Sequence, residues 1–387
     1  MLSGSRRLAV RPLAVLLLAV ALLEFGTNLQ GVVLPIVGHG RGSGIVTIGL
    51  YSASWSAGFV FACLCVGQVL GRLGSRRGFV TLALLSTCMS TLLLLFPGDR
   101  TWIYLRLVIG FCYGGMSAIV EGWLMGQAGA SRAFASYMLV NLLASLAGTL
   151  SLDVTGVVGP TPFLLTSAAI VLSAGTVALG RIPSPPIPER FYPHIGLLVR
   201  KSPLASLGCV VAGLITGAIA GLAPLFGIMS ALSVDADTIM LAANTVGGAI
   251  ATLMLALLSE RVGRHRLLIA QSMLGLIICA PFVMLSHLPR ATLIALMGAF
   301  GFVQYPLYGL CVGIANAATP DRLPARIAGE LLLLFGLGTI AGPLIGSELL
   351  KSGIPALFAF IGGTLLVLLI TGLWAQLGPR LKPPITG

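Results

Sequence analysis

Five ionisable side chains lie within long apolar stretches of this chain and are the residues best placed to do chemistry. They are Glu24, Arg106, Glu121, Asp153 and Glu330. An ionisable group among apolar residues is costly to bury unless it is paired or hydrated, so each is a candidate functional residue. Asn28 follows Glu24 by one helical turn and shares its face. Glu24 with Asn28 therefore predicts a carboxylate for which a proton and a polar ligand compete.

Each of these residues also has a structural alternative. Glu24 can be hydrogen-bonded to neighbouring helices and never titrate. Glu121 lies fifteen residues after Arg106, about 22 Å along a helix, so the two cannot pair directly. We expect Glu121 to pair with a loop arginine rather than to act as a second proton site. Asp153 and Glu330 stand near the ends of their apolar stretches, where structural ion pairs are the expected role.

Aromatic rings and amides occur in the same stretches and suit the lining of a ligand cavity. The residues concerned are Tyr113, Asn244, Gln304, Tyr305 and Tyr308. Rings combined with a few amides favour an amphipathic or aromatic ligand. The alternative for any one of them is packing between helices.

The composition decides which kind of element must position these residues. The chain has 387 residues, of which 57% are hydrophobic and 9% charged. Soluble proteins carry about 25% charged residues, so a soluble, disordered or nucleic-acid-binding chain is excluded despite the net charge of +12. The seven cysteines all lie in apolar runs, which argues against a disulfide framework. No metal or cofactor motif is found, and none is expected to be bound.

Continuous apolar runs predict an all-α polytopic membrane protein with twelve transmembrane helices, each about 20 residues long. The one long hydrophilic break contains the run Pro183-Ser184-Pro185-Pro186. It divides the chain into an amino-terminal six-helix half at 1–180, a linker at 181–202 and a carboxy-terminal six-helix half at 203–387. The expected spans are 13–35, 45–70, 78–97, 102–125, 134–156, 161–180, 203–228, 236–258, 267–286, 290–315, 327–349 and 354–377.

Lysine and arginine predict the orientation of the spans, because cytoplasmic connections are enriched in both. With a cytoplasmic amino terminus, inside segments carry eighteen of these residues and outside segments carry four. Both termini are therefore expected in the cytoplasm. The positive charge sets membrane topology, and no nucleic-acid partner is predicted.

The two halves repeat one another. The connection after the second span carries Gly67, Arg72, Gly74, Arg76 and Arg77, and the connection after the eighth carries Glu260, Arg261, Gly263 and Arg264. Arg72 and Arg261 are 189 residues apart, as are Gly74 and Gly263. Arg132 before the fifth span has a counterpart in Arg326 before the eleventh. Such repeats are typical of duplicated transporters.

These motifs resemble those of the major facilitator superfamily over nearly the whole chain. The loop motif occurs in both halves, and Arg106, Gly110 and Gly114 match the family's motif in the fourth span. Glu121-Gly122-Trp123-Leu124 is similar to a run in a poorly characterised bacterial branch near the drug/proton antiporters. The antiporter motif of the fifth span is missing there, whereas Gly338, Gly342, Pro343 and Gly346 place a similar pattern in the eleventh span.

The resemblance implies a gate at the cytoplasmic loops. In the family, an acidic residue of the loop motif pairs with the start of a helix in the other half. Gly71 stands where the first-half acid belongs, but Glu260 is present in the second half. We therefore expect an asymmetric latch in which Glu260 faces the start of the fifth span near Arg132. The alternative is that the arginines only set topology.

The resemblance and the intramembrane charges together predict a secondary active transporter working by alternating access. A carboxylate in span 1 and an arginine in span 4 resemble proton-coupled antiporters, so we expect proton-coupled efflux of an amphipathic compound. Proton-coupled uptake of a small metabolite is the alternative, and a polytopic membrane enzyme or a transporter-like sensor is less favoured. The expected partners are the substrate, protons and the lipid bilayer, for a monomer in a bacterial cytoplasmic membrane.

Overall fold

The computed structural model describes residues 10–125, 130–157, 159–180, 195–230, 232–285, 288–319 and 324–377. Within these ranges the regular structure is helical throughout, and twelve of the helices are long and apolar enough to cross a membrane. The prediction of an all-α polytopic membrane protein with twelve spans is confirmed.

The helices follow one another with short connections. The first group comprises α1 (Val10–Gly40), α2 (Ile45–Leu73), α3 (Ser75–Leu95), α4 (Asp99–Met125), α5 (Ala130–Leu150), the short α6 (Leu152–Thr155) and α7 (Thr161–Leu179). The second comprises the short α8 (Ile195–Lys201), α9 (Pro203–Met229), α10 (Val234–Val262), α11 (Arg264–Met284), α12 (Arg290–Ala318), α13 (Pro324–Leu350) and α14 (Ile354–Leu377).

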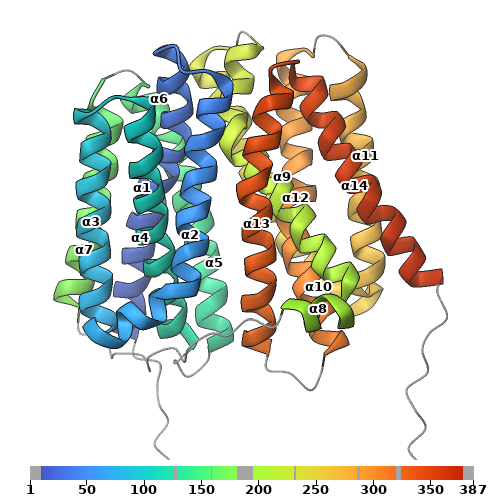
Figure 1. The fold of residues 1–387 in the computed structure, drawn as a ribbon, viewed down its shortest axis with the longest axis horizontal. Coiled ribbons are helices and arrows are strands. Elements are labelled where there is room, and N and C mark those ends of the chain that lie inside the picture. The colour runs from blue at the N-terminus through green and yellow to red at the C-terminus, as the bar shows by residue number, and fades with distance from the viewer. Residues whose placement is uncertain are drawn as a thin grey trace, which may run out of the picture.

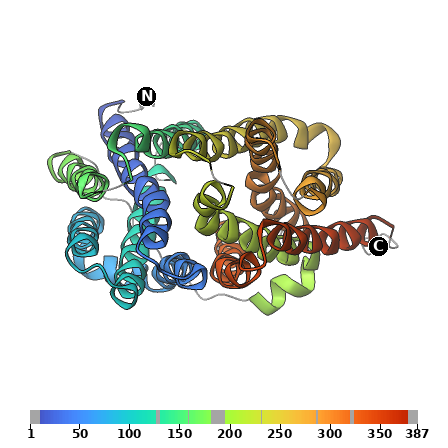
Figure 2. The same ribbon diagram turned by 90° about the horizontal axis from the view of Figure 1, so that it is seen from above.

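The two groups lie side by side as two bundles (Figures 1 and 2). In the first bundle α2 packs on α4, and α1 packs on α5 and α7; in the second α10 packs on α12, and α9 packs on α13. We call the end of the molecule where α1 begins and α14 ends the terminal face, and the opposite end the distal face. Helix α6 lies at the distal face (Figure 1).

Equivalent glycines turn the chain at the terminal face in both bundles. Gly74 joins α2 to α3 with φ of 74°, and Gly263 joins α10 to α11 with φ of 90°. Their ψ values of 156° and 137° place both in a region that is essentially restricted to glycine. The repeat read from the sequence therefore has the same backbone geometry in its two copies.

Glycines also let particular helix pairs touch backbone to backbone. A side chain on Gly110 of α4 would overlap the carbonyl oxygen of Trp55 on α2, and one on Gly301 of α12 would overlap that of Asn244 on α10. Without a hydrophobic force between helices in lipid, such close van der Waals packing holds them together. These two contacts fix Trp55 and Asn244 on the facing sides of the two bundles.

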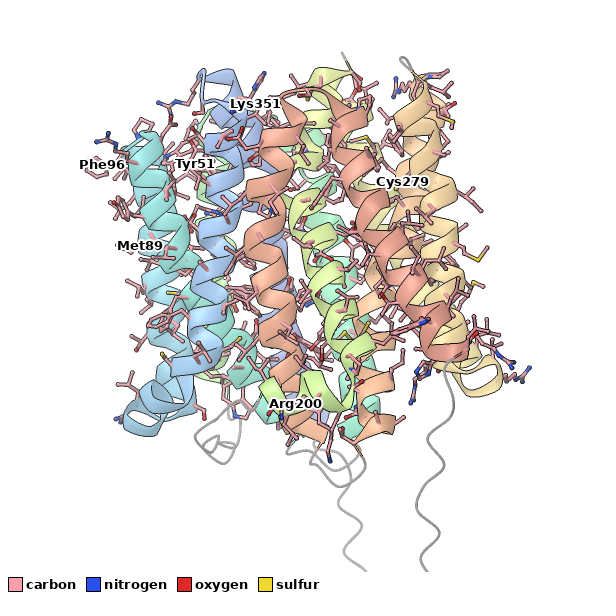
Figure 3. The ribbon with its side chains drawn as sticks, turned by 45° about the vertical axis from the view of Figure 1, so that its right-hand side comes forward. Tyr51, Met89, Phe96, Arg200, Cys279 and Lys351 are labelled. Carbon is pink, nitrogen blue, oxygen red and sulfur yellow. The ribbon has the colours of Figure 1, made fainter. Side chains whose placement is uncertain are left out.

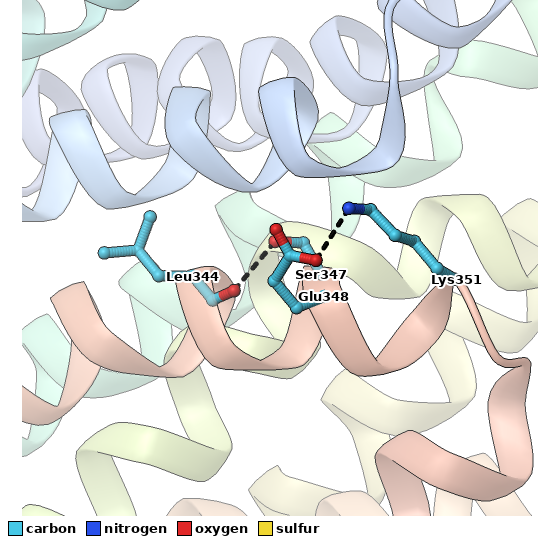
Figure 4. Close-up of polar contacts among 4 residues, drawn as sticks. All are labelled: Leu344, Ser347, Glu348 and Lys351. Atoms are coloured by element: carbon cyan, nitrogen blue, oxygen red, sulfur yellow. Dashed lines mark hydrogen bonds and ion pairs between the residues drawn. The ribbon is translucent and has the colours of Figure 1, made fainter.

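Small residues bring the two bundles together near the distal face, and we call this contact the distal gate. It consists of Gly49 and Ser52 on α2, Gly221 on α9, and Pro343 and Ser347 on α13. A methyl group on Gly49 would lie 2.5 Å from Ser347 Oγ, and one on Gly221 would lie 2.7 Å from Ser52 Oγ. Ser347 Oγ donates to the carbonyl of Leu344 at 3.0 Å, with α2 passing beside α13 (Figure 4).

The hydrophobic cores show that the distal gate is closed. Residues on the distal part of the first bundle, including Val33 and Tyr51, share one core with residues of the second bundle such as Ile219 and Phe226. The terminal part of the first bundle has a separate core that extends from Leu16 to Val177 and includes no residue of the second bundle. The bundles are thus joined at the distal side.

One short helix lies within the predicted linker 181–202. Helix α8 packs against α9, α12 and α13 at the terminal face, with Leu198 fully buried. Arg200 lies at this end of the molecule, opposite Lys351 at the distal end (Figure 3). The prolines that interrupt helix formation lie earlier, so the apolar residues after them are free to fold back onto the second bundle. Residues 181–194 lie outside the described part of the chain.

The contact between α2 and α4 predicts a position-specific effect of added volume. Gly110→Ala is expected to lower the free energy of unfolding by about 1–3 kcal/mol, because the new methyl group overlaps the Trp55 carbonyl. Gly122→Ala on the same helix is the matched control, since no atom lies within 4 Å of a side chain added there. The thermal midpoints of the two purified variants in detergent measure the difference, and equal midpoints would contradict this packing.

The distal gate predicts a second effect, on conformation rather than stability. Gly49→Val is expected to hold the gate open, because the side chain would occupy the space of Ser347. Electron–electron distances between spin labels at Arg41→Cys and Lys351→Cys, in a background without the native cysteines, should lengthen. Gly175→Val, which adds the same volume where no atom lies within 4 Å, is the control. An unchanged distance distribution in Gly49→Val would show that this contact does not form the gate.

Candidate functional site

A cavity of about 450 Å³ lies between the two bundles. Four helices of the first bundle line it (α1, α2, α4 and α5), as do four of the second (α9, α10, α12 and α13). Eight of the nine residues predicted from the sequence contribute to the lining: Glu24, Asn28, Arg106, Tyr113, Glu121, Asn244, Gln304 and Tyr305. A cavity shared equally by two packed halves is suited to a ligand of small-molecule size.

Glu24 is a buried acid whose hydrogen bonds come from other helices. Its side chain is 7% exposed, and the Tyr113 hydroxyl donates to Oε1 at 2.5 Å. Asn141 of α5 also hydrogen-bonds the carboxyl. One turn further along α1, Asn28 accepts a hydrogen bond from Thr149 at 2.8 Å. The carboxyl is thus positioned by α4 and α5 and still reaches the cavity.

Three aromatic rings form a continuous cluster beside Glu24, which we call the aromatic cluster: Trp55, Phe59 and Tyr113. Their ring centroids are 5.2 Å apart for Trp55 and Tyr113, and 5.9 Å apart for Trp55 and Phe59. Trp55 Nε1 is buried without a hydrogen-bond partner. An unpaired buried donor is costly, so this indole N–H gains stability if rearrangement of the cavity brings an acceptor to it.

Arg106 lies on the other side of the aromatic cluster from Glu24. It is 6% exposed, and it donates to Gln30 Oε1 at 3.2 Å and to the Tyr51 carbonyl at 3.4 Å. Its guanidinium carbon is 5.7 Å from the Trp55 ring centroid, within the range of a cation–π contact. Among the described residues no carboxylate forms an ion pair with it. Neutral groups therefore hold this cation in the cavity wall.

The second bundle contributes amides rather than charges. Gln304 Nε2 donates to Asn244 Oδ1 at 3.3 Å, and Asn244 Nδ2 donates to the Met297 carbonyl at 3.0 Å. Gln304 Oε1 is buried and has no partner. Tyr305, which hydrogen-bonds Thr245, completes this wall. This wall is thus made of amides and rings and contains one amide oxygen without a partner.

Tyr308 and Glu121 differ in their relation to the cavity. Tyr308 does not line the cavity: it is turned toward α13, where its ring lies 5.0 Å from that of Phe335 and its hydroxyl donates to the Ala328 carbonyl. Phe335 occupies the cavity wall in front of it, which corrects the expectation for Tyr308. Glu121 lines the cavity, and its expected pairing with a loop arginine stays a prediction, since the side chains of Arg72 and Arg132 lie outside the described residues.

The predicted gating loops show contacts within each bundle. Arg76 donates to the Ala178 carbonyl near the end of α7, and Arg264 donates to the Gly313 carbonyl of α12 at 3.1 Å. Arg77 and Arg261 are exposed. Arg76 and Arg264 thus bind carbonyls of their own half and not of the opposite half. This agrees with a structure in which the halves are joined at the distal face. The surroundings of Gly67 and the side chains of Arg72, Arg132 and Glu260 lie outside the described part of the chain.

Asn141 of the fifth span is one of the amides that the sequence offers for a cavity lining, but its hydrogen bond to Glu24 is set by packing. Asp237 was not among the sequence-based candidates. Asp237 is buried near the distal face, with 6% of its surface exposed. It stands at the expected start of a span, where a water-exposed acid is ordinary. In the described ranges, no three His, Cys, Asp or Glu side chains gather as a metal site.

Comparisons with known proteins agree with this architecture. The family model of the Major Facilitator Superfamily matches residues 16–332 and 205–386. The chain is 24% identical over 348 residues to an uncharacterized MFS-type transporter, YcaD, of Escherichia fergusonii, covering 88% of this chain and 89% of that protein. It is 25% identical over 370 residues to an uncharacterized MFS-type transporter of Yersinia pestis, covering 93% and 94%.

Solved structures share the fold at lower identity. The nucleoside transporter NupG superposes with a TM-score of 0.77 and 12% identity, over 95% of this chain and 99% of that one. A bacterial homolog of the human lysosomal transporter Spinster, in an inward-facing and occupied conformation, gives 0.74 and 15% identity, covering 95% and 96%. With twelve spans, a duplicated loop and a family model that covers most of its length, this chain belongs to the major facilitator superfamily of transporters.

Proposed function

We propose that the protein is a proton-coupled secondary transporter that exports an amphipathic compound. The observation that carries this proposal is the Glu24 carboxyl, which lies in a cavity shared by both bundles and is held by Tyr113. A carboxyl in such a place is accessible to a proton and to a ligand, and both bind to the same oxygens. Exchange of one for the other is the elementary step of antiport.

The mechanism follows from the closed distal gate. With the gate closed, substrate enters from the terminal face, and its cationic or hydrogen-bond-donating group binds Glu24 and displaces the proton to that side. The bundles then rock so that the cavity opens at the distal face, where the substrate leaves and an external proton binds. The substrate favours one of the two states, open at the terminal face or open at the distal face, only if its contacts differ between them. In this protein the contacts that differ are those of the distal gate and of the cavity walls.

The cavity lining supports an amphipathic substrate with an aromatic part. Trp55, Phe59 and Tyr113 offer ring faces, and Gln304 Oε1 offers an unpaired acceptor. Such a lining binds rings by stacking and orients them with a few hydrogen bonds. Arg106 lies at the far side of the rings, where it binds an acceptor or negative group of the substrate.

The orientation and setting belong to the same proposal. Arg6, Arg7, Arg11, Arg380 and Lys382 flank the first and last spans, which assigns the terminal face to the cytoplasm by the positive-inside rule. We propose a monomer in a bacterial cytoplasmic membrane with both termini inside. No enzymatic step is needed for this function.

The central test is transport by purified protein in liposomes with an imposed pH gradient, against a panel of aromatic amphipathic compounds. Glu24→Gln is expected to reduce gradient-driven flux to the level of empty liposomes, because the amide cannot exchange a proton. Glu348→Gln, which removes an exposed acid paired with Lys351 at 2.6 Å, is the control and should retain wild-type flux.

The sign of the proton flux distinguishes export from uptake. Protons that move opposite to the compound support the proposed antiport, and protons that move with it would replace it by uptake of a metabolite. Full gradient-driven transport by Glu24→Gln would show that Glu24 is not the proton carrier. If no compound of the panel changes the proton flux or is itself transported, the protein does not transport this class of compounds.

The latch at the terminal face gives a further prediction. If Glu260 holds that face shut by pairing with the start of α5, Glu260→Gln removes a charge-assisted hydrogen bond of about 1.5 kcal/mol or more, a tenfold shift toward the open terminal face. Accessibility of a cavity cysteine, Ser117→Cys, to a membrane-impermeant reagent on each side measures this shift. An unchanged ratio would contradict the latch.

A further inference from the structure

Asp237 lies in a second, small cavity on the seam between the two bundles. This cavity has a volume of about 40 Å³ and is close to the distal face. Val32, Ile36 and Leu152 line it from the first bundle, and Gly227, Ile228 and Asp237 are among the residues that line it from the second. Asp237 stands in the first turn of α10. The side of this cavity formed by Val32, Ile36 and Leu152 therefore exists only while the bundles are joined at the distal side.

The carboxyl of Asp237 is incompletely satisfied in this position. Its side chain is 6% exposed, and Oδ1 is buried without a hydrogen-bond partner. The backbone of Gly227 on α9 provides a hydrogen bond to the carboxyl. A negative charge with one backbone donor and an unpaired oxygen in an apolar cavity is strongly disfavoured. The added hydrogen of the neutral acid removes that charge.

No opposite charge is available to Asp237 in the described part of the chain. At the distal ends of the elements packed around it, the titratable or charged groups are His39 of α1, Asp153 of α6, Asp235 of α10 and Arg290 of α12, and all four are exposed. Helices α5, α9 and α11 present no such group at their distal ends. Ion pairing therefore does not compensate the burial of this carboxylate.

We propose that Asp237 is a second proton-binding site, which takes a proton from the distal solution when the distal gate closes. In the open gate α1 and α6 move away from α9 and α10, water reaches the carboxylate, and the proton returns to the same side. Asp237 thus binds a gating proton, distinct from the proton that Glu24 exchanges across the membrane. Because the closed state holds one more proton, acid on the distal side favours closure, by up to tenfold per pH unit.

This inference rests on the alternating access of the proposed function, but not on the role of Glu24 or on the direction of transport. The experiment is therefore made in the Glu24→Gln background, without substrate, so that the central carboxyl does not contribute. Spin labels at Arg41→Cys and Lys351→Cys report the distal distance in reconstituted protein, with the native cysteines replaced. The pH is varied between about 5 and 9, a range that covers perturbed carboxyl groups.

The expected result is a closed population that grows as the pH falls. Asp237→Asn, which is neutral at every pH and nearly isosteric, should remain closed throughout the range. Asp235→Asn removes an exposed acid from the same helical turn and should respond as the parent does. Asp237→Ser is a second neutral variant, which should also lose the response if the asparagine variant does not fold.

Two results would overturn the inference, and a third concerns the proposed function instead. A parent without any pH response, or an Asp237→Asn variant with the parent's response, shows that Asp237 binds no gating proton. The same labels in protein that keeps Glu24 test alternating access separately, on addition of a transported compound. A distal distance that never changes there contradicts the rocking mechanism itself, whatever the behaviour of Asp237.

Discussion

The cost of charge in an apolar environment is the constraint on which the rest of the structure depends. Each intramembrane ion needs polar partners from other helices, so it determines which helices must approach one another. Glu24 draws α4 and α5 toward α1 through Tyr113 and Asn141, and Arg106 draws α1 and α2 toward α4 through Gln30 and the Tyr51 carbonyl. Glu24, Arg106 and Tyr113 all line the cavity, so the contacts that compensate these charges also position one side of the site.

Close backbone packing makes those partners reachable. Gly110 allows α4 to lie directly against the backbone of α2, and this contact places the Trp55 ring between Tyr113 and Arg106. Gly301 has the same role in the second bundle, where it positions Asn244 beside Gln304. The halves therefore pack in the same way but differ in chemistry: both walls carry rings, but the first adds ionisable groups and the second adds amides.

Sequence reasoning predicted what depends on local pattern, and failed where packing decides. The twelve spans could be predicted from hydropathy. The equivalence of the turns at Gly74 and Gly263 could be predicted from the repeat, because both turns have positive φ, which favours glycine. The placement of Tyr308 depends on the rotation of α12 against α13, which no short pattern encodes. Asp237 was missed because an acid at a helix start is ordinarily solvated, whereas here packing against α9 and against the opposite bundle buries it.

The two buried acids differ in when they are buried, and this difference separates their roles. Glu24 lines the cavity between the bundles, but its hydrogen-bond partners Tyr113 and Asn141 belong to its own bundle, so rocking of one bundle against the other leaves them in place. Asp237 is covered in part by Val32, Ile36 and Leu152 of the opposite bundle, so part of its environment changes with the gate. A carboxyl group whose partners persist is suited to carrying a proton between the closed and open states of the distal gate. A carboxyl group whose environment changes with the gate instead biases the equilibrium between these states. The chain thereby separates transport from gating: the Glu24 carboxyl has its partners in its own bundle, and the Asp237 carboxyl lies where the two bundles meet.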